Sequence, residues 1–258
     1  MVASREALLE NFAKPEGYIG EFLGDYMLHE NYELNVWAAK VINAQKHDHI
    51  LEIGFGPGIA IQELSKLVPD GRVVGIDYSD LMVVKAKKLN AEAIQKGQVK
   101  LLSGSVENLS LSLGEEQFDK IVAVNTAMYW KDTIQTMSKI LGHLKPGGTL
   151  SIILHRADQS VRDGSCQDEI KWYSDNLYYA GFGSVYVQSQ TLPRTKREFI
   201  SSRKTVQEIL WGYDGGEYDL AGICITATKS STPHLYDATK LYLNVDNRFG
   251  IARSITLT

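Results

Sequence analysis

The sequence predicts an α/β fold in which a doubly wound, seven-stranded sheet is mostly parallel and carries helices on both faces. Short β-rich apolar runs alternate with longer amphipathic stretches from residue 50 to residue 153, as expected of βαβ units. A glycine-rich turn follows the first run, and two more apolar runs follow a later helix that ends in glycine. Together these observations predict a Rossmann-like sheet that finishes in an antiparallel pair of strands.

Seven segments are predicted as strands because they are apolar, rich in β-branched residues and bounded by turn residues. The five strands of the parallel part are His49–Ile53, Arg72–Asp77, Val99–Ser103, Lys120–Asn125 and Thr149–Leu154, and the antiparallel pair is Val185–Ser189 and Ala221–Thr228. Helices are expected to fill most of the gaps between them.

Two helices of the parallel part have clear signals. After the first strand, Ile61, Leu64 and Leu67 recur at helical spacing, so one face of that helix should cover the sheet. The next helix is predicted to begin near Ser79-Asp80, which are good N-cap residues, and to stop around Gly97.

Three parts of the chain differ in character. Residues 1–48 are rich in aromatic residues and glycine and predict a helical cap that closes over a pocket. Residues 49–229 hold the Rossmann-like core. In residues 230–258, Leu241, Leu243 and others alternate with polar residues, which predicts a terminal hairpin or an arm that joins two copies in a homodimer.

The composition is that of an ordinary globular protein with 258 residues, of which 44% are hydrophobic and 22% charged. The 27 basic and 31 acidic residues give a net charge of -4, so no nucleic-acid partner is expected. Cys166 and Cys224 are far apart, and neither a disulfide framework nor a zinc or other metal site is implied. Because neither a signal peptide nor a bilayer-spanning stretch is evident, the sequence predicts a cytoplasmic protein without membrane insertion.

The segment LEIGFGPG at 51–58 is a strand that runs into a glycine-rich turn. Gly54, Gly56 and Gly58 avoid Cβ clashes and permit positive φ, so the turn can wrap the methionyl and ribose parts of a nucleoside ligand. The alternative is a tight turn that binds nothing.

Two residues of the same turn argue against a dinucleotide. A dinucleotide fingerprint requires glycine at position 59, where this chain has Ile59. Pro57 removes an N–H donor that a pyrophosphate-binding loop would use. The ligand therefore need not carry phosphate.

A second feature lies about twenty residues further on, at the end of the next strand. Asp77 stands where an acidic side chain accepts hydrogen bonds from both ribose hydroxyls. Tyr78 and Met82 follow and are suited to sandwiching an adenine ring. Asp77 could instead be a helix N-cap.

Further motifs make the chain similar to a known family between Lys14 and Phe182. They are LEIGFGPG at 51–58, GRVVGIDYSD at 71–80, LLSGSVENL at 101–109, FDKIVAVNTAMYW at 118–130 and LKPGGTL at 144–150. With them the sequence resembles the class I S-adenosylmethionine-dependent methyltransferases, and among these the group that is similar to ubiquinone and menaquinone C-methyltransferases.

This resemblance implies that the cofactor is S-adenosylmethionine. It implies that the three glycines cradle the cofactor, that Glu52 orders the loop and the ammonium end, and that Asp77 holds the ribose. The family usually has an acidic residue facing the adenine amino group, where this chain has Ser105 and Val106, so that contact should be weaker or come from the backbone. Asn125 and Thr126 are expected to line the methionine end of the cofactor.

Methyl transfer moves a carbon from a sulfonium to a nucleophile in line, and the cofactor supplies the reactivity. The protein mainly positions the partners, and Tyr129 and Trp130 are expected to face the methyl group or the acceptor. For a hydroxyl or an acidic carbon a base is useful, and the candidates are His155, just beyond the fifth strand, and His29 in the cap. Either histidine could also be a surface or hydrogen-bonded residue.

The expected acceptor is a small molecule with an O, N or C nucleophile, and the aromatic residues of helix 168–179 suggest an apolar or aromatic one. A noncatalytic binding or regulatory protein of the same fold is the alternative. Base methylation is disfavoured because the fourth strand lacks the Asn/Asp-Pro-Pro-aromatic motif, and arsenic methylation because two scattered cysteines supply too few thiols. Nicotinamide-dependent hydride transfer is the weakest alternative.

Overall fold

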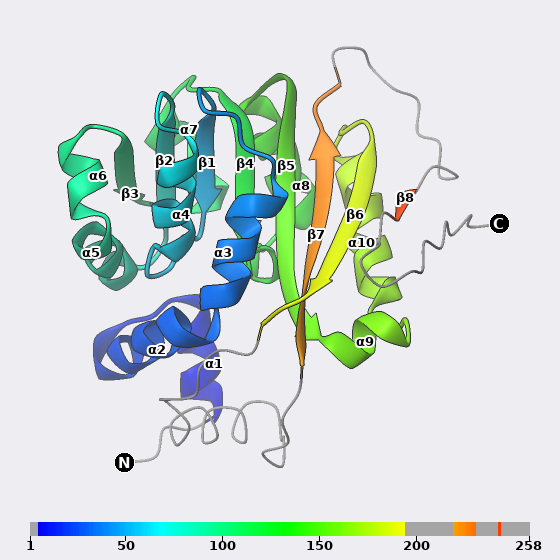
Figure 1. Ribbon diagram of the computed structural model, residues 1–258, viewed down its shortest axis with the longest axis horizontal. Helices are drawn as coiled ribbons and strands as arrows, with labels where there is room; N and C mark the ends of the chain where they lie inside the picture. Colours follow the sequence, from blue (N-terminus) through cyan, green and yellow to red (C-terminus); the bar gives the residue numbers. More distant parts are fainter. Residues whose placement is uncertain (1–4, 194–218, 231–241, 244–258) are drawn as a thin grey trace.

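The computed structural model describes residues 5–193, 219–230 and 242–243, and the statements that follow concern these residues. They form one sheet with helices on both faces (Figure 1). The strands are β1 (His49–Ile53), β2 (Arg72–Asp77), β3 (Val99–Ser103), β4 (Phe118–Val124), β5 (Leu144–Ala157), β6 (Val185–Thr191), β7 (Leu220–Thr228) and β8 (Tyr242–Leu243). The longer helices are α1 (Arg5–Ala13), α2 (Gly17–Glu30), α3 (Tyr32–Val41), α4 (Ile59–Leu67), α5 (Asp80–Leu89), α8 (Thr133–Gly142) and α10 (Gln167–Tyr179). The short ones are α6 (Ala91–Gln95), η1 (Val106–Asn108), α7 (Leu109–Leu113), η2 (Ala127–Tyr129) and α9 (Asp158–Arg162).

The sheet has the order β3-β2-β1-β4-β5-β7-β6-β8. The first five strands of this order are parallel to one another, and β7 is antiparallel to both β5 and β6. This confirms the predicted mostly parallel sheet with an antiparallel pair at its C-terminal side. The short β8 adds an eighth strand, parallel to β6, from the segment predicted as a hairpin or dimer arm. Residues 231–241 and 244–258 of that segment lie outside the described residues.

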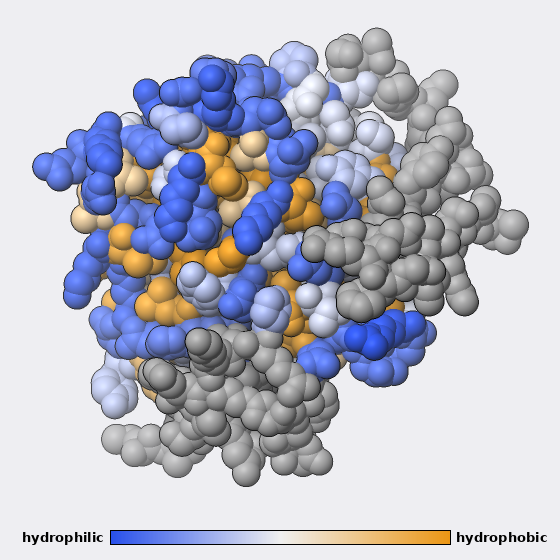
Figure 2. Space-filling model, in the orientation of Figure 1, coloured by the Kyte–Doolittle hydropathy of each residue, from blue (hydrophilic) through white to orange (hydrophobic). Residues whose placement is uncertain are grey.

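Each face of the sheet is covered by its own group of helices. On the front face in Figure 1, α3, α4 and α5 bury apolar side chains such as Trp37, Leu64 and Val83. On the opposite face, α8 and α10 bury side chains that include Met137 and Ile170. Figure 2 shows hydrophilic side chains over much of the front face and apolar ones between them. Each helix thus buries its apolar face and exposes its polar face, as the spacing of apolar residues predicted.

The fifth strand is longer than predicted, which changes the setting of one candidate base. Instead of ending at Leu154, β5 continues to Ala157 because β7 pairs with it along its whole C-terminal half. His155 therefore lies within the strand, opposite Gly222, and not beyond it. The sequence could not show this, because the extension depends on a partner strand more than sixty residues away.

The predicted helix from Ser79-Asp80 to Gly97 is divided into α5 and α6 at Asn90. Ser79 is the N-cap, as expected, and its hydroxyl accepts a hydrogen bond from the backbone N–H of Met82. Asn90 is buried, and its Nδ2 donates to the carbonyls of Gly58 and Ala86, both at 3.0 Å. This side chain ties the break between the two helices to the start of α4.

Besides the packing of α3 on the sheet, contacts with α5 attach the cap to the core. Ser79 Oγ donates to the carbonyl of Pro15 at 2.5 Å. Lys85 forms ion pairs with both Glu21 and Asp25 of α2, at 2.7 Å and 2.8 Å. Figure 1 shows α1 and α2 at the end of the sheet where the parallel strands finish. The cap therefore lies over the carboxyl ends of the strands, where open α/β sheets bind their ligands.

Candidate active site

A pocket of about 570 Å³ lies between the cap and the carboxyl ends of β1, β2, β4 and β5. This volume is typical of small-molecule sites, which span about 300–1,000 Å³. The predicted site residues that line it are Gly54, Gly56, Asp77, Tyr78, Met82, Asn125, Thr126, Tyr129 and His155. Four separate segments of the sequence thus converge on one cavity.

The glycine turn adopts the backbone that its sequence predicts. Gly54 and Gly56 have φ of +70° and +53°, in the left-handed region. A Cβ on Gly54 would lie 2.7 Å from Cβ of Thr126, so the turn packs directly against the segment that follows β4. A Cβ on Gly56 would meet no atom within 4 Å. Gly54 is therefore required for packing, whereas Gly56 lies beside the open pocket.

We expect Gly54→Ala to destabilise the fold more than Gly97→Ala does. Gly97 also has a positive φ, +72°, but a Cβ there would meet no atom within 4 Å. Both variants incur about 1–3 kcal/mol of backbone strain, and Gly54→Ala adds overpacking of about 1–3 kcal/mol against Thr126. Thermal unfolding of the two proteins measures the difference. Equal losses would show that Thr126 moves away without cost.

Asp77 holds the glycine turn through its own carboxylate. Oδ2 accepts from the backbone N–H of Gly56 at 2.7 Å, and Oδ1 accepts from the N–H of Ser79 at 2.8 Å. Burial raises the pKa of this carboxyl above 3.8, and the two N–H donors counteract that shift. Ser79, and not Asp77, caps α5, so the N-cap alternative for Asp77 is wrong.

Glu52 is a buried acid next to this site. Its side chain is 1% exposed, and neither carboxylate oxygen has a hydrogen-bond partner among the described residues. Burial, and next the nearby Asp77 carboxyl, raise the pKa of Glu52 well above 4.5. A buried carboxyl without a partner is costly. It therefore points to a bound group that would supply hydrogen bonds or positive charge.

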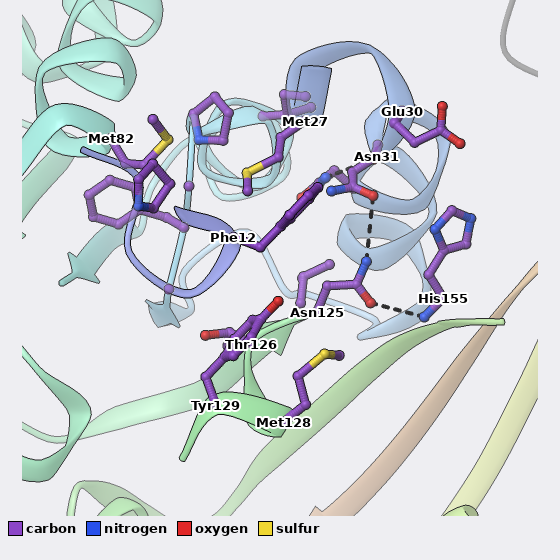
Figure 3. Close-up of a pocket in the computed structure, with 18 of the residues that line it drawn as sticks. Phe12, Met27, Glu30, Asn31, Met82, Asn125, Thr126, Met128, Tyr129 and His155 are labelled. Carbon is purple, nitrogen blue, oxygen red and sulfur yellow. Dashed lines mark hydrogen bonds between the residues drawn. The ribbon is translucent and has the colours of Figure 1, made fainter. Parts of the chain in front are cut away.

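A short series of hydrogen bonds joins the cap to the sheet at the pocket wall (Figure 3). The backbone N–H of His155 donates to Asn125 Oδ1 at 3.0 Å, and Asn125 Nδ2 donates to Asn31 Oδ1 at 3.5 Å. Asn31 ends α2 and precedes α3. The three residues all line the cavity, so β4, β5 and the cap meet there.

Arg156 also lines the pocket, but its guanidinium is already paired. Nε donates to Glu169 Oε2 at 2.6 Å, Nη2 pairs with the same carboxylate, and Nη1 donates to the carbonyl of His155 at 2.6 Å. No other lysine or arginine is among the described residues that line the cavity. An anionic group in the pocket therefore needs neutral donors.

Aromatic and thioether side chains give the pocket its apolar part. Figure 3 shows Phe12 and Met27 of the cap facing Tyr129 and Met128, which follow β4. Burial raises the pKa of the Tyr129 hydroxyl above 10, so the phenol is neutral around pH 7. Tyr129 can therefore donate a hydrogen bond or offer its ring face, but it is a poor base.

Several predicted residues lie outside the described lining of the pocket. Gly58 is the N-cap of α4, and Ser105 is the N-cap of η1, where its hydroxyl accepts from the N–H of Glu107. Val106 is buried in the core behind it. His29 lies on α2, one position before the lining residue Glu30. Glu52 lies in β1, beneath the glycine turn.

One expectation for an aromatic residue is wrong. Trp130 does not face the cavity, since it is 7% exposed and belongs to the core under α8 and α10. Of the tyrosines of α2, Tyr18 is 91% exposed, whereas Tyr26 lines the pocket.

The pocket also contains side chains that the sequence did not single out. They include Pro15, Met27, Glu30, Asn31, Asn35, Met128, Arg156 and Leu220. Most belong to the cap or to the paired ends of β5 and β7, where no motif marks them. The spacing of Met27, Asn31 and Asn35 by four residues was the one available signal, because it places them along one side of consecutive helices.

Comparisons with known proteins identify the family of this chain. A family model described as a methyltransferase domain matches residues 50–148. The uncharacterized methyltransferase YdaC of Bacillus subtilis is 30% identical over 169 residues, covering 66% of this chain and 90% of that protein. The chain is a class I S-adenosylmethionine-dependent methyltransferase. Its cofactor is S-adenosylmethionine, and the nicotinamide alternative is wrong.

Other relatives of this methyltransferase vary in their acceptors. The demethylmenaquinone methyltransferase of Symbiobacterium thermophilum is 32% identical over 111 residues, which are 41% of this chain and 43% of that protein. The solved Haemonchus contortus Phospholethanolamine N-methyltransferase 2, in complex with phosphomonomethylethanolamine and S-adenosylhomocysteine, shares the fold with a TM-score of 0.63. It is 18% identical, and the match covers 89% of this chain and 61% of that one.

The residues present fit the cofactor. The positive-φ turn leaves room for a nucleoside. The buried Glu52 carboxyl, which has no hydrogen-bond partner among the described residues, suits a cationic group. Among the helices that the structure describes, none has both the length and the apolar composition needed to cross a membrane.

Proposed function

We propose that this methyltransferase modifies a small molecule with an apolar or aromatic body, at an O, N or C nucleophile. The observation that carries this proposal is the pocket under the cap, whose lining beside the glycine turn includes Phe12, Met27, Met128 and Tyr129. A cavity roofed by the cap suits a small acceptor better than a polymer. The relative named for demethylmenaquinone supports the same class.

We also propose how the chain holds its cofactor. Gly54, Gly56 and Gly58 form the cradle, Asp77 binds the ribose, and Glu52 meets the ammonium end. The other proposed cofactor residues are Tyr78, Met82, Ser105, Val106, Asn125 and Thr126. When bound, the cofactor supplies an electrophilic methyl group on a sulfonium. The task of the protein is then to exclude water and to orient the two reactants.

A base is needed only for an acceptor that must lose a proton. We propose His155 for this task, because it lines the pocket at the end of β5 and an imidazole titrates near neutral pH. His29 is the weaker candidate, since Glu30 and not His29 lines the cavity. Tyr129 is proposed to orient the acceptor and to stabilise the sulfonium with its ring.

A screen with methyl-labelled S-adenosylmethionine tests the proposed acceptor class. We expect label to pass to hydrophobic quinols, phenols or amines. Protein substrates, transfer RNA and DNA serve as the contrasting acceptors and should remain unlabelled. Transfer to a polymer alone would contradict the proposal, and binding of the cofactor without transfer to any acceptor would favour the noncatalytic alternative.

Two substitutions of Tyr129 separate its ring from its hydroxyl. Tyr129→Phe should reduce kcat by less than about tenfold, because a neutral phenol is not a base and general bases contribute about 10²–10⁴. Tyr129→Ala should reduce kcat/KM more, since the ring is lost. Steady-state kinetics with an acceptor from the screen measures both. A Phe variant that is as impaired as the Ala variant would assign the effect to the hydroxyl.

A further inference from the structure

The amide groups of Asn31 and Asn125 meet at the pocket wall, and their orientations are linked (Figure 3). A backbone N–H can only donate, so the Asn125 atom that faces the N–H of His155 must be the oxygen. The other end of that amide is then NH₂, and Asn31 must present its oxygen to it. One backbone group therefore fixes both side chains.

Asn125 is suited to this task by its backbone. Its φ is +50°, which is unusual for a residue other than glycine. Its own N–H donates to the carbonyl of Ile153 at 2.9 Å, so the main chain leaves β4 in a defined left-handed turn. Asparagine tolerates this region better than most residues, and unlike glycine it carries an amide.

The fixed orientation leaves the Asn31 NH₂ group turned away from Asn125. Within residues 5–193 and 219–230, Asn31 Nδ2 donates to no protein atom. The backbone carbonyl of Asn31, by contrast, accepts from both the backbone N–H and Nδ2 of Asn35. Among the described residues that line the cavity, Arg156 is occupied by Glu169 and by the carbonyl of His155, whereas Asn31 Nδ2 on the cap side has no protein acceptor among these residues.

We propose that Asn125 is a positioning residue that turns the Asn31 amide, and that Asn31 Nδ2 donates to the carboxylate of the bound cofactor. The carboxylate is the anionic group of S-adenosylmethionine, and it needs donors in a pocket where the one arginine of the described lining is paired. Asn31 also joins α2 to α3. The contact would therefore connect the cofactor to the cap, whichever acceptor is methylated.

Binding of S-adenosylmethionine and of its decarboxylated form, measured calorimetrically on the whole chain, tests the contact without an acceptor. The two ligands differ only in the carboxylate. Asn31→Ala should weaken S-adenosylmethionine binding by about tenfold or more, because a hydrogen bond to a charged group is lost. Its affinity for the decarboxylated ligand should stay within about twofold of wild type.

Variants of Asn125 test the positioning role. Asn125→Gly keeps the left-handed backbone but lacks the amide, and Asn125→Asp can accept from His155 but cannot donate to Asn31. Both should selectively weaken S-adenosylmethionine binding. Asn43 also has a positive φ, +52°, and is absent from the described pocket lining, so Asn43→Gly is the matched control and should bind both ligands normally.

Three outcomes would overturn the proposal. Unchanged binding of S-adenosylmethionine by Asn31→Ala would mean that its amide does not hold the carboxylate. Equal weakening of both ligands would assign Asn31 to general packing of the cap. Normal binding by both Asn125 variants would show that Asn31 needs no positioning partner. None of these results depends on the identity of the acceptor.

Discussion

Asp77→Ala should lower the affinity for S-adenosylhomocysteine by on the order of a hundredfold. The side chain does two things at once, since it holds the glycine turn through Gly56 and Ser79 and is proposed to bind the ribose. Alanine leaves the N–H groups of Gly56 and of the buried Ser79 without this acceptor, and it removes the proposed ribose acceptors. Isothermal titration with S-adenosylmethionine and S-adenosylhomocysteine measures the loss, and NAD should not bind to either protein.

A neighbouring acid provides the matched control for this experiment. Asp80 is exposed at the first position of α5, and its Oδ1 accepts from Ser103 Oγ at 2.5 Å. Asp80→Ala removes the same charge from the same turn without touching Gly56, so it should bind the cofactor nearly normally. Thermal unfolding of both variants separates loss of the site from loss of the fold. Normal binding by Asp77→Ala would remove Asp77 from the proposed cofactor site.

The strands and the glycine turn could be predicted because their signals are local. Each parallel strand is a short apolar run bounded by turn residues, and β1, β2 and β3 match their predicted limits. The turn after β1 needs glycine at Gly54 for a reason visible in the sequence, namely a tight change from strand to helix. Asp77 follows from its place at the end of the next strand.

The side of the pocket formed by the cap and β5 could not be predicted in the same way. Asn31 and Glu30 belong to the cap, whose docking depends on pairs such as Lys85 with Asp25 that are sixty residues apart. His155 was placed beyond its strand because the partner strand β7 is distant in sequence. Trp130 lies in the hydrophobic core and not at the pocket, because its direction depends on core packing. The three-part division at residues 48 and 229 stays a prediction.

Glu52→Gln should abolish a proton exchange that accompanies cofactor binding. In the free protein, burial keeps the pKa of Glu52 well above 4.5, so the carboxyl holds a proton at pH values where an exposed glutamate has lost it. A cationic ammonium nearby favours the ionised form and lowers that pKa. Binding of S-adenosylmethionine should therefore release a proton from Glu52, while neutral 5′-methylthioadenosine should release none.

The same acid makes the free protein less stable as the pH rises. Because the pKa of Glu52 is higher in the folded state than in the unfolded state, folding takes up a proton above pH 4.5, and stability falls as the pH rises through the folded pKa. Glutamine cannot ionise, so Glu52→Gln should lose this part of the pH dependence. Thermal unfolding across a pH series measures it for the free protein.

Titration calorimetry in two buffers of different ionisation enthalpy counts the protons released on binding. We expect wild type to release a proton when it binds S-adenosylmethionine, and Glu52→Gln to release none. Glu52→Gln should also bind S-adenosylmethionine on the order of a hundredfold more weakly, because the charge partner of the ammonium is gone. An equal proton count in the two proteins would place the titrating group elsewhere. The charge of Asp77 raises the pKa of Glu52, so Asp77→Asn should reduce the number of protons released on binding without abolishing the release. The two acids therefore act as one coupled pair beneath the glycine turn.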